Sequence, residues 1–142
     1  MTLLEVRSID ARGPRFSAAI TTLVLALALV TQSVALIAIQ LVVFAIGAFA
    51  GPAKTPYAFL YKKFVKPRLS GEVPTEDSRP PQFAQSVGLI FTVVALAGSL
   101  LSIPALFTVA VGFALFAAFL NAAFNFCLGC EIYLIAVRIF KK

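Results

Sequence analysis

The stretch "PALFTVAVGFALFAAFLNAAFNF" (residues 104–126) decides the class of fold. It carries no charged residue, and nearly every position is apolar. A helix that crosses the hydrocarbon core of a bilayer needs about 20 consecutive, predominantly apolar residues. The sequence therefore predicts a transmembrane helix over residues 104–126.

The remainder of the chain repeats this pattern. Of its 142 residues, 61% are hydrophobic and 13% are charged, whereas a soluble domain has about 45–50% apolar and about 25% charged residues. Uncharged stretches predict three more helices at about residues 16–33, 34–50 and 83–101. Glu5 and Asp10 precede the first stretch, so we expect a retained helix and no cleavable signal peptide. We expect an all-α polytopic membrane protein: a single membrane domain over residues 1–142, with four transmembrane helices arranged as two hairpins.

The basic residues predict the orientation of these helices. The chain has 12 Lys and Arg residues, and all of them lie before the first helix, in the central loop 51–82 or after the fourth helix. Lys and Arg are retained on the cytoplasmic side of a membrane. We therefore expect both termini and loop 51–82 on the cytoplasmic side of the inner (plasma) membrane. This rule also accounts for the net charge of +6, so we expect no nucleic-acid partner.

Two polar segments have the pattern of amphipathic helices in the headgroup plane. Thr55 and Pro56 are suited to the start of a helix, and apolar residues recur on one face of residues 57–66, with lysines over much of the rest. The tail 131–142 has a similar composition. We expect both segments to be interfacial helices. An irregular Pro-, Gly- and Ser-rich stretch should follow the first of them, before the third transmembrane helix.

The two halves of the chain resemble each other. "RGPRF" (residues 12–16) precedes the first hairpin and "RPPQF" (residues 79–83) precedes the second. Each hairpin is followed by a tyrosine-containing basic tail, "TPYAFLYKKFVK" (residues 55–66) or "EIYLIAVRIFKK" (residues 131–142). Both halves would start on the same side of the membrane, so the pattern indicates a parallel duplication.

Small residues indicate how the helices pack. Lipid supplies no hydrophobic drive between helices, so close approach through small side chains becomes important. The fourth helix has such a residue at every fourth position: Ala110, Ala114, Ala118 and Ala122. We expect this stripe to pack inside the bundle, surrounded by membrane lipid. A homo-oligomer that uses the same stripe is the alternative.

The sequence "CLGC" (residues 127–130) holds the only two cysteines, and the chain contains no histidine. A zinc site normally needs four Cys or His ligands, so we expect no metal here. A structural disulfide is disfavoured on the reducing cytoplasmic side. Two small buried hydrophobes remain an alternative. We favour a reactive dithiol at the cytoplasmic interface, with a helix break near Gly129.

The roles within this dithiol follow from helix electrostatics. A helix that starts at the motif would lower the pKa of the first thiol, because its N–H groups point at the sulfur. We therefore assign Cys127 as the attacking thiolate and Cys130 as the thiol that resolves a mixed disulfide. Other polar and charged residues are candidate tuning or docking groups: Asn121, Asn125, Glu131, Arg12 and Arg15.

Several segments resemble one known family. "DARGPRF", "GPAKTPYAFLYKKFVKPRL", "PPQFAQSVGL" and "FLNAAFNFCLGCEIYL" are similar to an actinobacterial membrane family, domain-of-unknown-function family 4395, over about residues 9–136. Its terminal C-L-G-C-E-x-Y element matches Cys127 to Tyr133. The resemblance implies thiol or sulfur chemistry by association with thioredoxin-like proteins and rhodanese-type sulfurtransferases.

We therefore expect a membrane dithiol that takes part in thiol redox chemistry or sulfur relay with a thioredoxin-like or rhodanese-type partner. A transporter or channel component for a small sulfur anion such as thiosulfate is one alternative. A membrane scaffold with structural cysteines is another. The residues imply no cofactor, and a quinone is suggested by architecture alone. Whether the protein is an enzyme stays open.

Overall fold

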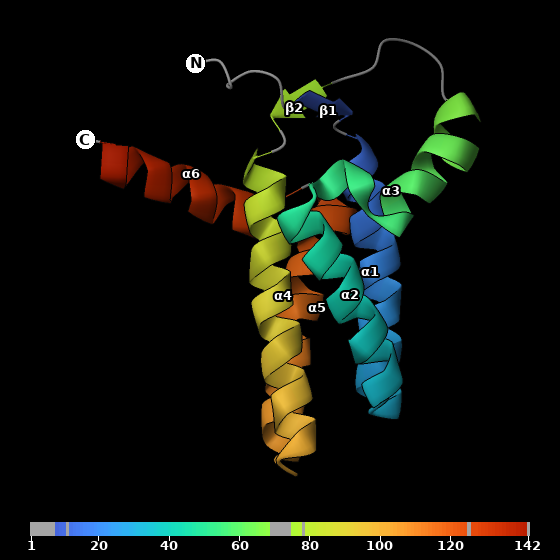
Figure 1. The fold of residues 1–142 in the computed structure, drawn as a ribbon, viewed down its shortest axis with the longest axis vertical. Helices are drawn as coiled ribbons and strands as arrows, with labels where there is room; N and C mark the ends of the chain where they lie inside the picture. Colours follow the sequence, from blue (N-terminus) through green and yellow to red (C-terminus); the bar gives the residue numbers. More distant parts are fainter. Residues whose placement is uncertain (1–7, 11, 69–74, 78, 125, 142) are drawn as a thin grey trace.

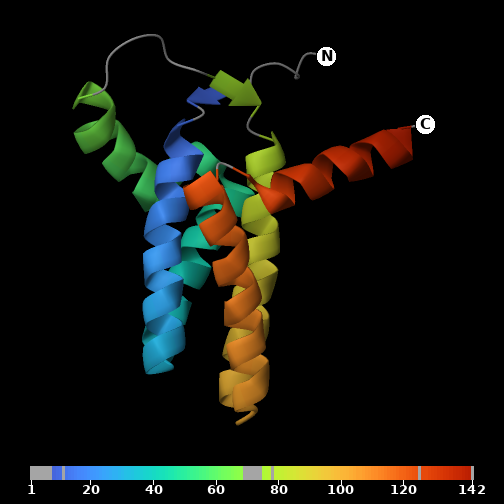
Figure 2. The same cartoon turned by 180° about the vertical axis from the view of Figure 1, so that it is seen from behind.

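The computed structural model describes residues 8–10, 12–68, 75–77, 79–124 and 126–141. Four helices form an up-and-down bundle (Figure 1): α1 (Arg12–Thr31), α2 (Val34–Phe49), α4 (Arg79–Leu100) and α5 (Pro104–Phe124). The closest packing is between α1 and α5, between α2 and α4, and between α4 and α5. Figure 2 shows α1 and α5 side by side on the opposite face of the bundle.

The bundle core is built from apolar side chains of all four helices. Leu25, Ile37, Ala95 and Val111 are almost completely buried, one from each helix. Small residues allow the helices to approach closely. A Cβ atom added at Gly88 would lie 2.6 Å from the ring of Phe44, which places α4 directly against α2. Of the expected alanine stripe, Ala110 and Ala114 lie in the core and Ala118 packs against it, so these residues serve packing within the chain as expected. The homo-oligomer remains a prediction.

Both hairpins turn in the same way. Gln32 and Ser102 adopt left-handed backbone conformations, with φ of 55° and 61°. The residue after each turn closes the preceding helix: the N–H of Ser33 donates to the carbonyl of Ala28 at 3.1 Å, and the N–H of Ile103 donates to that of Gly98 at 2.7 Å. This is the Schellman pattern of helix termination.

The helical class is confirmed, and so are three of the four expected membrane spans. Helices α1, α4 and α5 have 20, 22 and 21 residues and are apolar enough to cross a membrane. Helix α2 has 16 residues, which at about 1.5 Å per residue covers about 24 Å of the ~30 Å hydrocarbon core. It stops at Phe49 because Gly51 turns the chain with a φ of 118°.

The remaining elements gather at the end of the bundle opposite the two turns. The central segment contains η2 (Pro52–Lys54), α3 (Pro56–Leu60), η3 (Tyr61–Val65) and η4 (Lys66–Arg68). Thr55 caps α3, with its Oγ1 accepting the N–H of Ala58 at 3.1 Å. The single amphipathic helix expected over residues 57–66 is instead a short α-helix followed by a π-helical turn. Tyr57 and Tyr61 are buried, whereas Phe64 is exposed.

The structure also contains a small strand pair that the sequence did not predict. Strand β1 (Ser8–Asp10) and strand β2 (Thr75–Asp77) pair antiparallel, with Ile9 opposite Glu76. Each strand stands one residue before a long helix, β1 before α1 and β2 before α4. The pair therefore joins the starting points of the two halves.

A ring contact joins the tail to the first helix in both halves, although the tyrosine that matches Tyr133 in the repeat is Tyr57 and not Tyr61. In the first half, Phe16 of α1 lies against Tyr61 of η3, with ring centroids 5.7 Å apart and an interplanar angle of 46°. In the second half, Phe83 of α4 lies against Tyr133 of α6 (Leu128–Lys141), at 5.6 Å and 48°. Each tail thus folds back onto the first helix of its own half in the same ring geometry.

Candidate functional site

The two cysteines lie at the first turn of α6. They form a disulfide with a Cα–Cα distance of 5.1 Å. Cys127 caps the helix: its carbonyl accepts the N–H of Glu131 at 3.0 Å. Its Sγ accepts the backbone N–H of Cys130 at 3.1 Å. The first sulfur therefore receives a direct hydrogen bond at the positive end of the helix dipole.

The helix break expected near the motif is confirmed and lies just before Leu128. Helix α5 ends at Phe124, and α6 begins at Leu128, three residues before the start expected for the tail. Arg15 of α1 closes the end of α5, donating from Nε to the carbonyl of Ala122 at 3.0 Å and from Nη2 to that of Ala123 at 3.4 Å. A cation at these free carbonyls is favourable because they form the negative end of the dipole.

Gly129 itself lies within the first turn of α6 and has a packing role. It is buried, and a Cβ atom added to it would lie 2.7 Å from Cβ of Ala84 and 2.8 Å from Cα of the same residue. The absence of a side chain lets the first turn of α6 touch α4. Together with the contact between Phe83 and Tyr133, this approach fixes the start of α6 beside the start of α4. Beyond this crossing α6 runs away from the bundle (Figure 1).

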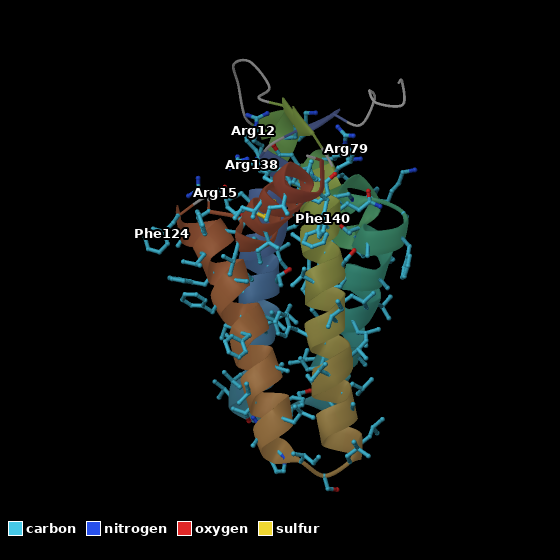
Figure 3. The ribbon with its side chains drawn as sticks, turned by 90° about the vertical axis from the view of Figure 1, so that its left-hand side faces the viewer. Arg12, Arg15, Arg79, Phe124, Arg138 and Phe140 are labelled. Atoms are coloured by element: carbon cyan, nitrogen blue, oxygen red, sulfur yellow. A yellow bond between two sulfur atoms is a disulfide. The ribbon has the colours of Figure 1, made fainter. Side chains whose placement is uncertain are left out.

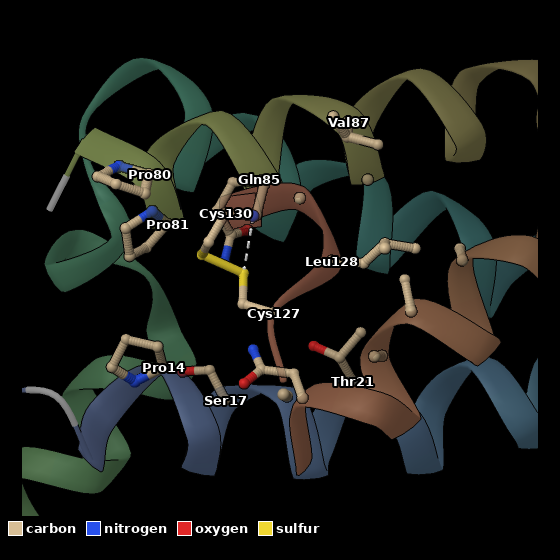
Figure 4. Close-up of a pocket in the computed structure, with 18 of the residues that line it drawn as sticks. Pro14, Ser17, Thr21, Pro80, Pro81, Gln85, Val87, Cys127, Leu128 and Cys130 are labelled. Atoms are coloured by element: carbon tan, nitrogen blue, oxygen red, sulfur yellow. Dashed lines mark hydrogen bonds between the residues drawn. A yellow bond between two sulfur atoms is a disulfide. The ribbon is translucent and has the colours of Figure 1, made fainter. Parts of the chain in front are cut away.

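The disulfide forms part of the wall of a cavity of about 390 Å³. The cavity lies between α1, α4, α5 and the first turns of α6. Figure 4 shows the sulfur atoms between Pro14 and Ser17 of α1 on one side and Pro80 and Pro81 of α4 on the other. Its size falls within the ~300–1,000 Å³ typical of small-molecule sites.

Most of the predicted site residues meet at this cavity. Asn121, Arg15 and Glu131 line it together with both cysteines. Arg12 begins α1 at the same end of the bundle but does not line the cavity. Asn125 lies outside the described residues.

Gln85 belongs to the site but was not predicted from the sequence. Its side chain lines the cavity, and its buried Oε1 has no hydrogen-bond partner. It also fills the space beside Gly47 of α2, where an added Cβ atom would lie 2.6 Å from Oε1. The sequence does contain a signal for it, because Gln85 is a polar residue inside an otherwise apolar segment, two positions after Phe83.

A second buried glutamine lies deeper in the bundle. Gln40 of α2 is fully buried, and its Oε1 accepts the hydroxyl of Tyr57 at 2.8 Å. Burial raises the pKa of Tyr57, so this hydroxyl remains a donor. The bond ties the central segment to α2.

Positive charge is concentrated at the end that carries the disulfide. Figure 3 shows Arg12, Arg15, Arg79 and Arg138 grouped there, and the elements η2 to η4 add lysines at the same end. The opposite end consists of the two short turns, whose residues are uncharged. The charge asymmetry expected from the sequence thus coincides with the ends of the bundle.

Fold and site together define a helical membrane protein with a cysteine pair at the charged end of its bundle. The chain belongs to the family described as domain of unknown function DUF4395, which matches residues 9–138. No curated protein and no solved structure matches the chain.

Proposed function

We propose that this protein is an integral membrane thiol-redox protein whose Cys127/Cys130 pair exchanges electrons with a thioredoxin-like partner. The hydrogen bond from the N–H of Cys130 to Sγ of Cys127 carries the proposal. A thiolate at a helix N-terminus is stabilised by such N–H groups and by the dipole. If the two cysteines were only inert packing residues, neither this hydrogen bond nor their position in a cavity wall would be expected.

Exchange then proceeds through Cys127. A thiolate of the reduced partner attacks Sγ of Cys127, the S–S bond breaks, and the electron pair leaves on Cys130. The second partner thiolate attacks the mixed disulfide and releases Cys127 as a stabilised thiolate. The partner becomes a disulfide, and the two electrons remain on the Cys127/Cys130 pair. In the reverse direction, Cys127 attacks a partner disulfide and Cys130 resolves it.

The orientation completes the proposal. Because Lys and Arg are retained on the cytoplasmic side of a membrane, the basic end of the bundle, which carries the disulfide, faces the cell interior. Helix α2 completes the fourth span by local thinning of the bilayer, as short spans do. The exposed apolar residues of α6, with Phe140 86% exposed, fit a helix embedded in the membrane interface.

The test is a trapping experiment in lipid nanodiscs. Cys130→Ser should accumulate a mixed disulfide between Cys127 and a thioredoxin-like protein, because the resolving thiol is missing. Cys127→Ser should accumulate much less, since the remaining thiol lacks the N-terminal position. Equal trapping by both variants, or none by either, would contradict the proposal.

The same samples separate electron transfer from sulfur relay. Incubation of the reduced protein with a rhodanese-type protein and thiosulfate should leave the intact mass unchanged. Gain of one sulfur atom on Cys127, lost on reduction, would assign the pair to sulfane-sulfur transfer instead. Transport of the anion would be detected as uptake of labelled thiosulfate into proteoliposomes, with no requirement for either cysteine.

A further inference from the structure

The cavity beside the disulfide is large enough to hold a small molecule. It also adjoins the sulfur atoms that would exchange electrons with that molecule. Its volume is about 390 Å³, and the S–S bond is part of its wall. Apolar groups from all four bundle helices form most of the remaining surface, among them Ala18, Phe44, Phe91 and Ala118. A small apolar molecule inside it would therefore lie next to Cys127 and Cys130.

The polar groups around the cavity favour a neutral molecule over an anion. Helix N-termini bind anions through free N–H groups. Here Pro14 occupies the first turn of α1, and Pro80 and Pro81 occupy that of α4, and proline has no N–H to offer. In α6 the N–H of Cys130 is donated to Sγ of Cys127.

The one arginine in the cavity wall is also engaged. Arg15 donates from two of its nitrogens to the carbonyls at the end of α5. Those carbonyls carry partial negative charge, which offsets the guanidinium. The donors that remain in the wall are uncharged side chains such as Asn121 and the N–H groups at the start of α6, and the wall also contains the carboxylate of Glu131, which repels an anion. Thiosulfate or a phosphate would thus give up its hydration at a substantial desolvation cost.

Gln85 specifies one further property of the ligand. Its side chain lines the cavity, and its Oε1, buried against Gly47 of α2, has no partner. An unpaired buried acceptor costs free energy, which is recovered if the amide turns toward the cavity and accepts the hydroxyl of a ligand. The ligand should therefore be neutral, largely apolar and able to carry a hydroxyl group.

We propose that this cavity binds a lipid-soluble quinone, which takes two electrons from the reduced Cys127/Cys130 pair and leaves as the quinol. The inference rests on the proposed dithiol function and names its electron acceptor. A quinone is neutral and planar, and its quinol form supplies the hydroxyl that Gln85 can accept. It reaches the site from the bilayer in which the bundle lies.

The step balances in electrons and protons. The Cys127 thiolate adds to a ring carbon of the quinone, and the electron pair moves to a quinone oxygen. Cys130, as a thiolate, then attacks Sγ of Cys127. The new S–S bond forms, the C–S bond breaks, and the ring leaves with both electrons. The two protons released by the thiols are taken up by the two quinol oxygens.

The experiment uses the full chain in nanodiscs, reduced and kept free of oxygen. Addition of decylubiquinone or menadione should produce one quinol for each disulfide formed, followed by the quinone absorbance and by thiol alkylation. Gln85→Leu, which removes the acceptor at similar volume, and Ala118→Leu, which fills the cavity, should each slow this oxidation about tenfold or more. Ala105→Leu is the matched control: it lies on the same helix α5, is exposed and is outside the cavity, so its rate should equal that of the parent protein.

A second measurement detects binding without chemistry. In the Cys127→Ser/Cys130→Ser variant, decylubiquinone should raise the thermal unfolding temperature by mass action, and Ala118→Leu should abolish that rise. No rise in the double-serine variant, or an equal rise with Ala118→Leu, would overturn the assignment of the cavity.

Diamide, a thiol-specific oxidant that takes two electrons from a dithiol, separates the proposed quinone site from the proposed dithiol function. If it oxidises the pair while neither quinone does, the quinone site is wrong and the dithiol function stands. If neither oxidant forms the Cys127–Cys130 bond, both are wrong. If quinones oxidise the parent protein and the Gln85→Leu and Ala118→Leu variants at the same rate, the electrons leave by another route. The assignment of the cavity as the quinone site is then wrong.

Discussion

Gly129 lies so close to Ala84 that no side chain fits between them. An added Cβ atom would stand 2.7 Å from Cβ and 2.8 Å from Cα of Ala84. The start of α6, and with it the cysteine pair, is therefore positioned by direct contact with α4. Because one of the obstructing atoms belongs to the backbone, a rotamer change cannot relieve the clash.

Gly129→Ala should consequently destabilise the protein. Overpacking typically costs about 1–3 kcal/mol, which exceeds the gain of up to about 1 kcal/mol expected from replacing glycine by alanine in a helix. Thermal unfolding in detergent micelles measures the change. Gly112→Ala is the control, since no atom lies within 4 Å of a Cβ at that position. If Gly129→Ala and Gly112→Ala unfold alike, the close approach of α6 to α4 is not as described.

Arg15 should stabilise the junction between α1 and the end of α5. Arg15→Gln removes the charge and the two-nitrogen contact with the carbonyls of Ala122 and Ala123. Because Arg15 is exposed, we expect a loss of only about 1 kcal/mol. Lys62→Gln removes an exposed charge at the same end of the molecule and should leave the unfolding temperature unchanged.

Salt gives an independent check on this contact. Added sodium chloride should narrow the difference between Arg15→Gln and the parent protein, because salt screens the charge–dipole part of the interaction. A difference that is large and independent of salt would show that Arg15 acts through packing of its stem.

The sequence predicted the bundle well because the membrane imposes simple rules. Uncharged runs located α1, α4 and α5, and Thr55 identified the cap of α3. Side-chain periodicity was less reliable over residues 57–66: Tyr57 and Tyr61 are buried, but Leu60 and Phe64 are exposed, and residues 61–65 form a π-helical turn. Tyr61 packs on the ring of Phe16, a tertiary contact that the local pattern does not contain.

The members of the site were predictable from the sequence, but their surroundings were not. The spacing of Cys127 and Cys130 predicted that the two cysteines lie together, as they do, without showing that a cavity adjoins them; the reactivity of the pair stays a prediction. That cavity requires α1 and α4 to present Pro14 and Pro81 to the same space, which is a consequence of how the two halves pack. Gln85 was overlooked because a single amide in a span is usually satisfied by a neighbouring helix, whereas here its oxygen has no partner.

The bond between Tyr57 and Gln40 should contribute measurably to stability. Tyr57→Phe leaves Oε1 of the fully buried Gln40 without its donor, and an unsatisfied buried acceptor costs about 1–3 kcal/mol. Tyr133→Phe is the matched control, because it keeps the ring that packs on Phe83. In a double-mutant cycle, Tyr57→Phe should cost much less when Gln40 is already replaced by Leu. An equal cost in both backgrounds would contradict the bond.

The same tyrosine predicts a loss of stability in alkali. Burial raises the pKa of Tyr57 above its ordinary value of 10.0. Above about pH 10, the unfolded chain therefore loses a proton that the folded chain retains, and the free energy of unfolding falls as pH rises. Tyr57→Phe should reduce this fall, measured by chemical denaturation between about pH 9 and 11. A steeper fall in the variant would reverse the sign and exclude Tyr57 as its cause.

Ser102 adopts a left-handed conformation at the second hairpin, with a φ of 61°. Such a conformation costs a non-glycine residue about 1 kcal/mol. Ser102→Gly should therefore raise the free energy of unfolding by up to that amount. Part of this gain is offset because glycine adds conformational entropy to the unfolded chain. Ser99→Gly makes the same chemical change inside α4 and should lower stability by about 0.5–1 kcal/mol. Thermal unfolding of the two variants should move in opposite directions, and a shared direction would rule out backbone strain as the explanation.

The two cysteines should differ in reactivity once the disulfide is reduced. In Cys130→Ser, the remaining Cys127 keeps the cap position, and the backbone N–H of residue 130 can still donate to its Sγ. In Cys127→Ser, the remaining Cys130 sits within the first turn of α6, three residues after the cap position. Iodoacetamide reacts with the thiolate and not with the thiol, so Cys127 should be alkylated faster than Cys130 at pH 7. As the pH is raised, its alkylation rate should reach a plateau at a lower pH than that of a free cysteine, whose pKa is about 8.5. Alkylation rates across pH, followed by intact mass, measure both quantities. If Cys130 alkylates as fast as Cys127 and levels off at the same pH, the start of α6 does not activate the first sulfur, and the order of attack proposed for the pair must be reversed or abandoned.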